Sequence, residues 1–501
     1  MKALKIGPED NVAVLLGSVK AGDRIEISDS EIFIAEEDIN QGHKIALCDI
    51  NKGEAIVKYG NIIGYASHDI KEGSWVHIHN VKTGLQGIIE YRYEPDKAPI
   101  VQWENISDIP DRFMGYLRKN GEVGIRNEIW IIPTVACVND IARKLAALGN
   151  EYRSSISGYT DDVVAFTHPF GCSQTGEDKE ATERVLAGLA THPNAAGVLL
   201  LGLGCENSGI EAVIEKMGDY EPDRIRCLIC QNVEDEIKEG EKLLKELIVN
   251  AAEEGRTPVG IDKLTIGLKC GGSDGLSGIT ANPLLGVVAD KISQAGGSCI
   301  MTEVPEMFGA EKLLMNRCVN EELFNELVDM INRFKSYFMQ NGQNIYENPS
   351  PGNKAGGITT LEDKSLGCTQ KSGTSAVRGI IDYGERICEQ GLNLLYAPGN
   401  DPVAATALSA AHAQLILFTT GRGTPFAAPV PTMKISSNSD LAKRKKNWID
   451  YDAGELAEGK SRQESADRLI KKIIACAEGE KVCSEKAGYH DMAIFKRGVT
   501  L

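Results

Sequence analysis

The sequence predicts a small all-β domain followed by a large α/β catalytic region with mostly parallel sheets. Short apolar runs separated by glycines fill the first part of the chain, and a proline-containing segment without periodicity follows. From about residue 112 onward, apolar strands alternate with amphipathic helices. The 501 residues suffice for two to four domains, and we place the boundaries at 1–90, 91–111, 112–255 and 256–501.

The composition excludes several classes of function. The formal net charge is −17 and no basic run exceeds 443–446, so we expect no nucleic-acid partner. The most apolar runs, 195–203 and 413–418, are far shorter than a membrane span, and the N-terminus lacks an apolar leader. The thirteen cysteines are an odd number at wide spacing, which favours reduced thiols in the cytoplasm over a disulfide framework.

Residues 1–90 contain seven short runs at the spacing of a small β-barrel or clip. The runs are 12–16, 24–27, 32–35, 44–47, 55–59, 62–66 and 75–79. In an extended strand, residues two apart point to the same face, so His77 and His79 could reach one metal ion or one anion together. An exposed H-x-H pair can equally be ordinary surface. Lys44 is a further residue of this domain that could take part in chemistry.

The segment 91–111 carries Pro95, Pro99 and Pro110 among Glu, Asp and Asn residues, and it has no hydrophobic period. This composition is typical of an interdomain linker. A new domain is therefore expected to start near Arg112.

Residues 112–255 read as an α/β unit. The expected strands are 128–135, 163–167, 197–202 and 225–229, and the expected helices are 138–148, 177–189 and 233–252. Ligands of open α/β sheets bind beyond the carboxyl ends of the strands. Three successive strands here end in loops that carry Cys137, Cys172 and Cys205, and His168 lies in one of these loops. A single one could be an inert core cysteine, but three in equivalent places favour a site.

A second α/β unit begins near residue 256. Its strand 264–268 runs into Cys270, Gly271, Gly272, Ser273 and Asp274. Glycines let the backbone approach a ligand closely, while the other three residues supply a thiol, a hydroxyl and a carboxylate. The loop is therefore a candidate ligand cradle. The alternative is that its glycines merely turn the chain and that Asp274 caps the helix 283–295.

Other loops of this unit carry charged candidates. Glu306 follows the strand 298–302 and could bind a metal or abstract a proton, or it could simply begin a helix. The segment 344–368 is too rich in Pro, Gly and Asn for regular structure, and loops of that length tend to be functional. It carries Lys354 and leads to Lys371, both of which could bind a carboxylate. Arg422, between two glycines after the strand 414–420, could grip a carboxylate with two hydrogen bonds.

Nucleotide chemistry is not expected, because the chain has neither a Walker A motif nor a Rossmann fingerprint, and it has no G-x-S-x-G motif either. The candidate residues are thiols, imidazoles and carboxylates together with basic side chains on glycine-rich loops. Such a set suits a small acidic substrate and a divalent metal.

The chain resembles the altronate and galactarate dehydratase family from near Asp10 almost to its end. The motifs that carry this resemblance are GHKIALCDINKGEAIVKYGNIIGYA, HIHN, GYLRKNGEVGIRNEIWIIPTVAC, THPFGC, GLGCE, LKCGGSDGLSGITANPLLG, NPSPGNKAGG and FTTGRGTP. The resemblance implies an N-terminal SAF-type β-clip domain and a large α/β catalytic region. It also implies that a sugar acid is dehydrated to a 2-keto-3-deoxy acid with iron or another divalent metal.

Within this family, the HIHN pattern resembles the altronate enzymes. The expected reaction is therefore the conversion of D-altronate to 2-keto-3-deoxy-D-gluconate and water, as a hydro-lyase of hexuronate catabolism. Galactarate or another sugar acid is the alternative substrate, and a sugar-acid-binding protein without catalysis is the alternative from a different class. A split relative that eliminates sulfite from sulfolactate means that the fold alone does not fix the leaving group. The expected ligand is a small sugar acid, and a homodimer is a candidate assembly.

The reaction removes a proton from C2, next to a carboxylate, and a hydroxyl from C3. It needs a base, an acid and a means of stabilising the enediolate. We expect Fe(II) or Mn(II) on His77 and His79, with an iron–sulfur cluster on Cys137, Cys172, Cys205 and Cys270 as the alternative. The predicted acid–base residues are His168, Glu306 and Lys44. The predicted substrate-binding residues are Cys270, Gly271, Gly272, Ser273, Asp274, Lys354, Lys371 and Arg422.

Overall fold

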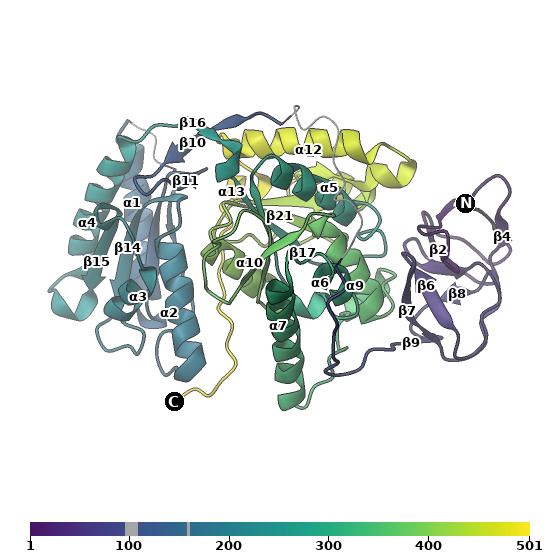
Figure 1. Ribbon diagram of the computed structural model, residues 1–501. Coiled ribbons are helices and arrows are strands. Elements are labelled where there is room, and N and C mark those ends of the chain that lie inside the picture. The colour runs from purple at the N-terminus through teal and green to yellow at the C-terminus, as the bar shows by residue number, and fades with distance from the viewer. Residues whose placement is uncertain (96–108, 158–160) are drawn as a thin grey trace.

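The computed structural model describes residues 1–95, 109–157 and 161–501. It has a small β domain followed by two α/β domains, each built on its own parallel sheet (Figure 1). The four-stranded sheet of the second domain lies on one side of the molecule, and the seven-stranded sheet of the third domain lies in the middle. The predicted fold class is confirmed.

The first domain consists of short antiparallel strands, and each of the seven predicted runs contains one of them. They form sheets of order β1-β2-β5-β8, β3-β4 and β6-β7-β9. The strands are β1 Ala3–Leu4, β2 Val12–Leu15, β3 Arg24–Glu26, β4 Ile32–Ile34, β5 Lys44–Ala46, β6 Ala55–Lys58, β7 Asn61–Ala66, β8 Trp75–Val76 and β9 Val81–Lys82. The last predicted run is shorter than expected, because its strand ends at Val76.

The β6–β7 hairpin shows how local chemistry fixes this domain. Its two-residue loop, Tyr59 and Gly60, has positive φ at both positions, 61° and 67°, which is the backbone of a type I′ turn. The carboxylate of Asp10 accepts hydrogen bonds from both of these backbone N–H groups, at 3.1 and 2.8 Å. A tyrosine can therefore occupy a position that normally favours Asn or Gly.

The second domain is a parallel sheet of order β13-β12-β14-β15 with helices on both faces. Alternate strand residues enter two cores: Ile129 and Ile131 face α1 and α4, whereas Trp130 and Ile132 face α2. Its elements are β12 Glu128–Pro133, α1 Asn139–Ser154, β13 Val163–Ala165, α2 Gly176–Ala190, β14 Ala195–Gly202, α3 Ile210–Met217, β15 Ile225–Ile229 and α4 Glu236–Ala252.

The third domain is a larger parallel sheet of order β19-β20-β18-β17-β21-β22-β23. Its strands are β17 Thr265–Cys270, β18 Ser298–Met301, β19 Val377–Ile381, β20 Gly391–Leu395, β21 Leu415–Thr420, β22 Thr432–Ser436 and β23 Tyr451–Asp452. Its helices are α5 Ala281–Gln294, α6 Glu311–Met315, α7 Glu321–Gln340, α8 Pro351–Ala355, α9 Leu361–Thr369, α10 Asp401–Ala410, α11 Ser439–Arg444, α12 Arg462–Ala477 and α13 Cys483–Lys486.

A small antiparallel sheet joins the two α/β domains. It has the order β11-β10-β16, with β10 Arg112–Leu117, β11 Val123–Gly124 and β16 Thr257–Gly260. Helix α2 of the second domain also packs against α10 of the third domain (Figure 1). The two domains therefore meet along a packed face as well as through their connecting strands.

Both parallel sheets reverse their strand order at one point. In the second domain the chain adds β13 on one side of β12 and then places β14 on its other side. In the third domain it extends outward from β17 and returns to place β21 against the free side of β17. Ligands of open α/β sheets bind beyond the strand ends at such reversals. The expected sites are therefore the β12/β14 edge and the β17/β21 edge.

The segment 344–368 is not the irregular loop that its composition predicted, since it contains α8 and most of α9. Helix α8 begins with a capping box, in which the Ser350 hydroxyl and the Asn353 side chain exchange hydrogen bonds with backbone N–H groups. Helix α9 begins with Thr360, whose hydroxyl accepts from the N–H of Asp363. The capping residues therefore allow helices to form in this segment despite its glycine and proline content.

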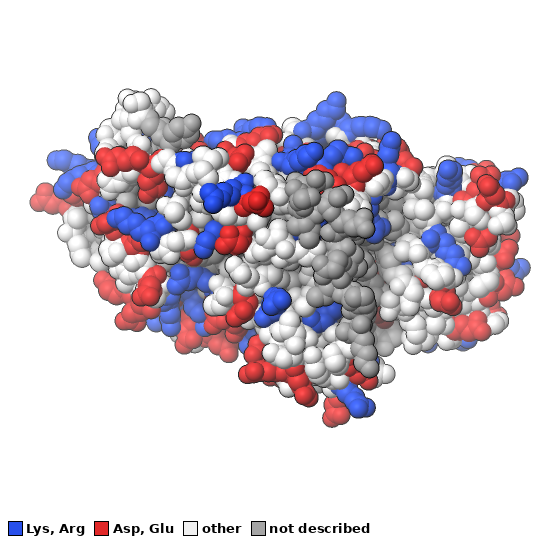
Figure 2. All heavy atoms as spheres, turned by 45° about the horizontal axis from the view of Figure 1, so that its top comes forward, with Lys and Arg blue, Asp and Glu red and all other residues white. Residues whose placement is uncertain are grey.

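The predicted linker 91–111 lies mostly outside the described residues. Its described start is held by the third domain: the Tyr91 hydroxyl donates to Glu311, and the Tyr93 hydroxyl donates to the Cys318 carbonyl at 3.0 Å. On the face drawn in Figure 2, basic and acidic side chains are interspersed. Within the described ranges, no helix combines the length and apolar character that crossing a bilayer requires.

Candidate active site

The carboxyl end of β17 holds a tight group of ionisable side chains. Ligand atoms of Cys270, Glu306 and Cys368 all lie within 4.8 Å of one another, and the part of the chain that is described contains no other such group of three His, Cys, Asp or Glu residues. The two sulfurs are 3.4 Å apart, and the Cys270 sulfur is 3.2 Å from Oε2 of Glu306. All three residues are buried. We call this group the buried cluster.

Three different elements position the buried cluster. Cys270 is the last residue of β17, Glu306 lies in the turn after β18, and Cys368 lies in the last turn of α9. Glu303 precedes Glu306 and has a left-handed backbone with φ of 72°. Such strain in a non-glycine residue persists where the surrounding structure enforces it, often at functional sites. The fold thus brings together residues nearly a hundred positions apart.

Buried lysines surround the cluster. Lys371 donates to the Cys270 sulfur at 2.8 Å, and Lys364 pairs with Oε1 of Glu306 at 2.7 Å. Lys269 pairs with Glu303 at 2.5 Å and with Asp401 at 2.6 Å. The Asp401 side chain is one-third exposed, whereas the lysines are almost fully buried. This network of charges therefore reaches solvent at Asp401.

The environment pushes the pKa values of these groups apart. The hydrogen bond from Cys368, together with Lys371 and against the effect of burial, lowers the pKa of Cys270 to about 6. Burial and the neighbouring Glu306 raise the pKa of Glu303 well above its usual range. Against burial, Lys364 and Lys371 lower the pKa of Glu306. Two nearby carboxyl groups with opposite shifts are the arrangement from which acid and base roles arise.

The first domain docks directly on the elements that carry the cluster. Lys44 and Lys58 place their ammonium groups 2.8 and 2.9 Å from the Asp363 carboxylate, and all three side chains are buried. Asp363 lies in the first turn of α9, the helix that also supplies Lys364 and Cys368. The ring of His43 lies 3.3 Å from the Ala355 carbonyl. This interface ties the small domain to the catalytic edge.

The predicted acid–base role of Lys44 does not fit this geometry. Lys44 is fully buried and donates to the Asp363 carboxylate and the Gly357 carbonyl. Burial, only partly offset by Asp363, lowers its pKa to about 8. Its place in the interface makes it a docking residue.

The expectation of an extended strand through His77 and His79 is wrong. Strand β8 ends at Val76, and 77–80 form a turn in which Asn80 accepts from the N–H of His77. His77 is buried with Nδ1 3.2 Å from the Thr359 hydroxyl, while His79 is exposed. Both rings pack against Trp75. Burial and Lys44 lower the pKa of His77 to about 3, so its ring is neutral near pH 7.

His168 is also not placed to act as an acid or base. It lies in the second domain and is buried, with Nε2 2.7 Å from the Pro133 carbonyl and Nδ1 accepting from the N–H of Phe170 at 3.2 Å. Both ring nitrogens therefore hold the loop. The acid–base role of His168 stays a prediction, and in this structure the ring braces its own turn.

The glycine-rich loop after β17 is close to the cluster, but the polar side chains of this loop are mostly engaged. The Asp274 carboxylate accepts from Ser277, Ser437 and Asn438. It therefore organises the loop and is not available to a substrate. Ser273 is buried and its carbonyl accepts from Asn353.

The two glycines of that loop are needed for close approach. A Cβ on Gly271 would lie 2.5 Å from the Asp401 carboxylate, and Gly272 has φ of 62°. The Gly272 carbonyl accepts from the N–H groups of Gly421 and Arg422, at 3.1 and 2.9 Å. The loops after β17 and β21 are thus joined at the strand reversal.

The predicted carboxylate binders divide into two kinds. Lys371 contacts the Cys270 thiol, as described above, and belongs to the cluster. Arg422 is exposed, and a Cβ built on Gly352 of α8 would lie 3.9 Å from its Nε. Lys354 is a half-buried residue of the same helix α8. Arg422 and Lys354 therefore remain the candidates for holding an anionic substrate.

The four cysteines predicted as alternative iron–sulfur ligands are divided between the two sheets. Cys137, Cys172 and Cys205 are exposed at the β12/β14 edge of the second domain. Cys270 is buried in the third domain beside Cys368. The structure does not bring Cys270 to the other three.

Sequence reasoning missed Lys269, Lys364, Cys368 and Asp401. Lys269 was hidden because it lies in an apolar strand, although a lysine in a buried strand is a signal that a partner charge is near. Lys364 and Cys368 were hidden because their segment was read as irregular, whereas one helix places them on the cluster. Asp401 follows Gly399 and Asn400 after β20, at a strand end where a polar residue is a candidate for a site.

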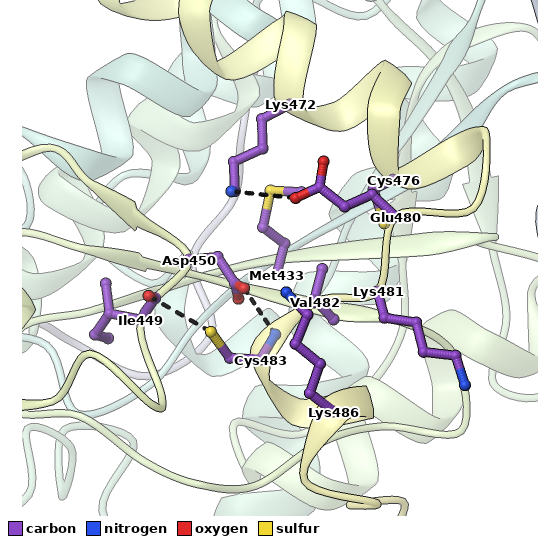
Figure 3. Close-up of a pocket in the computed structure, with 10 residues that line it drawn as sticks. All are labelled: Met433, Ile449, Asp450, Lys472, Cys476, Glu480, Lys481, Val482, Cys483 and Lys486. Atoms are coloured by element: carbon purple, nitrogen blue, oxygen red, sulfur yellow. Dashed lines mark hydrogen bonds and ion pairs between the residues drawn. The ribbon is translucent and has the colours of Figure 1, made fainter.

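A separate small cavity lies near the start of α13 (Figure 3). It has a volume of about 120 Å³, and Lys472, Cys476, Glu480 and Cys483 are among its lining residues. Lys472 pairs with Glu480 and Asp450 accepts from the N–H of Cys483. None of the predicted site residues lines this cavity.

Comparisons with known proteins match the whole arrangement. Three family models match in order: the altronate/galactarate dehydratase SAF domain at 1–84, the D-galactarate dehydratase/altronate hydrolase second domain at 115–252, and the D-galactarate/altronate dehydratase C-terminal domain at 261–500. The altronate dehydratase of Escherichia coli (strain K12) is 49% identical over 506 residues, covering 100% of both chains.

Two further relatives extend this comparison. The altronate dehydratase of Bacillus subtilis (strain 168) is 49% identical over 501 residues, covering 99% of both chains. The galactarate dehydratase (L-threo-forming) of Escherichia coli (strain K12) is 31% identical over 519 residues, covering 98% of this chain and 96% of its own. The similarity is thus full-length in each case and higher to the first kind of enzyme.

Proposed function

This chain belongs to the galactarate and altronate dehydratase family, and we propose that it is a hydro-lyase that converts D-altronate into 2-keto-3-deoxy-D-gluconate and water. The observation that carries the choice of substrate is the full-length identity of 49% to two altronate dehydratases, against 31% to a galactarate dehydratase. Galactarate remains the alternative substrate within the family.

The reaction is proposed to take place at the buried cluster. Lys364 and Lys371 stabilise the ionised form of Glu306. Its Oε2 faces the Cys270 sulfur, so Oε1, which pairs with Lys364, is the oxygen that takes the proton from C2. Glu303, whose pKa is raised by burial, keeps a proton that it can give to the departing C3 hydroxyl. Lys269 holds Glu303 in place and links it to Asp401 on the side that meets solvent.

The buried cluster also fits a divalent metal ion. Cys270, Cys368 and Glu306 offer two sulfurs and one carboxylate oxygen within 4.8 Å of one another. Thiolates favour Fe(II) over the harder Mn(II), so Fe(II) is the proposed ion and Mn(II) the second choice. When bound there, the ion would polarise the substrate carboxylate and favour the enediolate. We therefore propose the buried cluster, and not His77 and His79 of the first domain, as the metal site.

The substrate carboxylate is proposed to reach the site over the β17/β21 edge. Arg422 and Lys354 supply cationic groups there, and the Gly271–Gly272 backbone lets a ligand approach closely. The thirteen free cysteines suit a reducing compartment, so we place the enzyme in the cytoplasm.

The test is an assay of the full-length protein with D-altronate, galactarate and other sugar acids. Fe(II), Mn(II) and Mg(II) are added in turn under anaerobic conditions, and 2-keto-3-deoxy acid is the readout. A site built for one charged end rejects a ligand with two, because an unpaired buried charge costs several kcal/mol. We expect altronate to be preferred at least about a hundredfold in kcat/KM, equivalent to roughly 3 kcal/mol.

Two outcomes would count against the proposal. Equal rates on both acids, or a preference for galactarate, would contradict the substrate. Binding of altronate without any keto-deoxy product, in the presence of each metal, would indicate a binding protein. Full turnover after exhaustive chelation would remove the metal from the mechanism but leave the substrate in place.

A further inference from the structure

The second domain carries three exposed thiols that the proposed reaction does not use. Cys137 follows β12, Cys172 follows β13 and Cys205 follows β14, and all three are free and exposed. Free cysteine is among the most buried residue types, so three exposed thiols at one sheet edge need an explanation. We call this set the thiol edge.

The loops of the thiol edge form one continuous surface. The N–H of Ala136 donates to the Phe170 carbonyl at 2.9 Å, and the N–H of Ser208 donates to the Gly171 carbonyl at 3.2 Å. The N–H of Ser173 donates to the Asn207 side chain at 2.8 Å. Each loop is therefore hydrogen-bonded to the next.

The thiol edge lies at the strand reversal of its sheet. The Thr134 hydroxyl donates to the Glu206 carboxylate at 2.6 Å, which bridges the ends of β12 and β14. This is the position at which ligands of open α/β sheets bind. It is equivalent to the position of Cys270 in the third domain.

The loops beside Cys172 and Cys205 contain three residues with positive φ. Gly171 and Gly204 have φ of 98° and 122°, and Ser173 has φ of 58°. A Cβ on Gly171 would lie 1.9 Å from the Thr134 carbonyl, so that loop must approach closely. The N–H groups of Gly171, Ser173 and Gly204 donate to the side chains of Gln174, Asn207 and Glu206, so these hydrogen bonds hold the two loops in place. A strained Ser173 next to Cys172 fits a functional loop.

Among the described side chains beside the three sulfurs, His168 and Glu206 could add a ligand, but both are already engaged. Both nitrogens of His168 are engaged with the backbone, as described above. The Glu206 carboxylate holds the Thr134 hydroxyl and the N–H groups of Leu203 and Gly204. A structural zinc site needs four protein donors. A cubane cluster can instead be held by fewer protein ligands, with one iron left open.

We propose that Cys137, Cys172 and Cys205 hold a [4Fe–4S] cluster, and that the fourth iron is open to a small oxygen ligand such as a hydroxyl or a carboxylate. Each cysteine loses its thiol proton when its sulfur binds iron. The site of this iron–sulfur cluster is separate from the buried cluster of Cys270, Glu306 and Cys368 in the third domain. It does not depend on the choice of sugar acid.

Cys230 provides a matched control at the same sheet edge. It directly follows β15, the fourth strand, but it is buried, and burial raises its pKa to about 11. Cys230 therefore keeps its thiol proton near pH 7, and we do not expect it to bind the iron–sulfur cluster. Cys270 provides a second control in the other sheet.

The test uses the full-length protein reconstituted anaerobically with Fe(II) and sulfide. Iron and acid-labile sulfide are measured together with the visible charge-transfer absorption. We expect about four sulfides per chain, and about four irons in addition to the Fe(II) of the buried cluster. Cys172→Ser and Cys205→Ser should each lower both contents severalfold. Cys230→Ser and Cys270→Ser should leave the sulfide content unchanged, and Cys270→Ser should lose only the iron of the buried cluster. Near-ultraviolet circular dichroism and the melting temperature check that each variant is folded.

A second measurement addresses the open iron. The electron paramagnetic resonance spectrum of the reduced wild-type cluster should shift when a small carboxylate is added. Iron without sulfide, zinc in place of iron, or a wild-type protein that takes up no cluster would overturn the proposal. Loss of the cluster in Cys270→Ser but not in Cys172→Ser would also overturn it.

Discussion

The two parallel sheets of this protein carry the same strand-end pattern in opposite environments. In the second domain, Cys137 and Cys205 follow the two strands that flank a reversal of strand order, and in the third domain Cys270 ends one of the two such strands. In the second domain these thiols are exposed on loops, whereas in the third domain Cys270 and Cys368 are buried among lysines and carboxylates. The first environment suits a cofactor that covers three sulfurs, and the second suits proton transfer in a dry pocket.

The difference teaches that a pattern of strands and thiols locates a site but does not define its chemistry. What defines the chemistry is which charges are buried beside the thiol. Lys371 and Lys364 convert the third-domain edge into a site with separated pKa values. The first domain reinforces this, because its two lysines fix the helix that carries Cys368.

The largest expected effect comes from removing the cation beside Cys270. Lys371→Met should lower kcat/KM for D-altronate by about a thousandfold, in the range typical for loss of an acid–base or electrostatic contribution. The reason is that both Cys270 and Glu306 lose the charge that stabilises their ionised forms. Steady-state kinetics measure this, with the exposed Lys263→Met of the same domain as the control. Activity near that of the wild type would remove the buried cluster from catalysis.

The next effect concerns the docking of the first domain. Asp363→Asn should lower the free energy of unfolding by about 3–5 kcal/mol, because it leaves two buried lysines without their counter-charge. Denaturant unfolding measures this. Asp38→Asn, which removes an exposed partner of Lys20, should leave the melting temperature unchanged. If Asp363→Asn and Asp38→Asn have the same free energy of unfolding, the docking of the first domain does not depend on the buried charges.

A smaller effect depends on pH. Burial lowers the pKa of Lys44 to about 8 in the folded protein, below its usual value near 10.5. The folded state therefore carries a penalty that is complete below pH 8 and is relieved as the pH rises from 8 to 10.5. The unfolding free energy of the wild type, relative to Lys44→Met, should rise across this window. Urea unfolding at a series of pH values measures the difference, and a flat or falling difference would contradict the assignment.

The smallest effect distinguishes the two kinds of thiol. In the protein freed of metal, an alkylating reagent should label Cys172 and Cys205 before Cys270, because exposure controls access to the sulfur. Labelling these exposed thiols should leave the melting temperature unchanged. Peptide mapping by mass spectrometry after short exposures gives the order. Early labelling of Cys270 would show that the third-domain pocket opens more readily than its burial indicates.

Much of the fold followed from the sequence, because the periodicity of apolar residues and the spacing of glycines are local features. The strands after which Cys137, Cys172, Cys205 and Cys270 stand were predicted close to their observed positions. The turn at 77–80 was not, because the Asn80 side chain accepts a hydrogen bond from the His77 N–H and the strand ends early. Local strand propensity carries no information about such a bond.

The candidate site was predicted only in part. Cys270, Glu306 and Lys371 were singled out because they follow strands or stand on glycine-rich loops. Cys368 and Lys364 depend on a helix that the capping residues, not the hydrophobic pattern, define. Lys44 was predicted to take part in the chemistry, whereas in the structure it is buried against Asp363. This contact forms when the first domain docks on the third, and only the tertiary structure shows it.

The most direct test of the central claim is the position of the metal in crystals of the full-length protein loaded with Fe(II) without added sulfide. Anomalous diffraction at the iron edge locates the ion without reference to activity. We expect a peak bonded to the sulfurs of Cys270 and Cys368 and to the Glu306 carboxylate, and we expect it to be absent from Cys270→Ser. A peak at His77 and His79, with none at Cys270 and Cys368, would contradict the account.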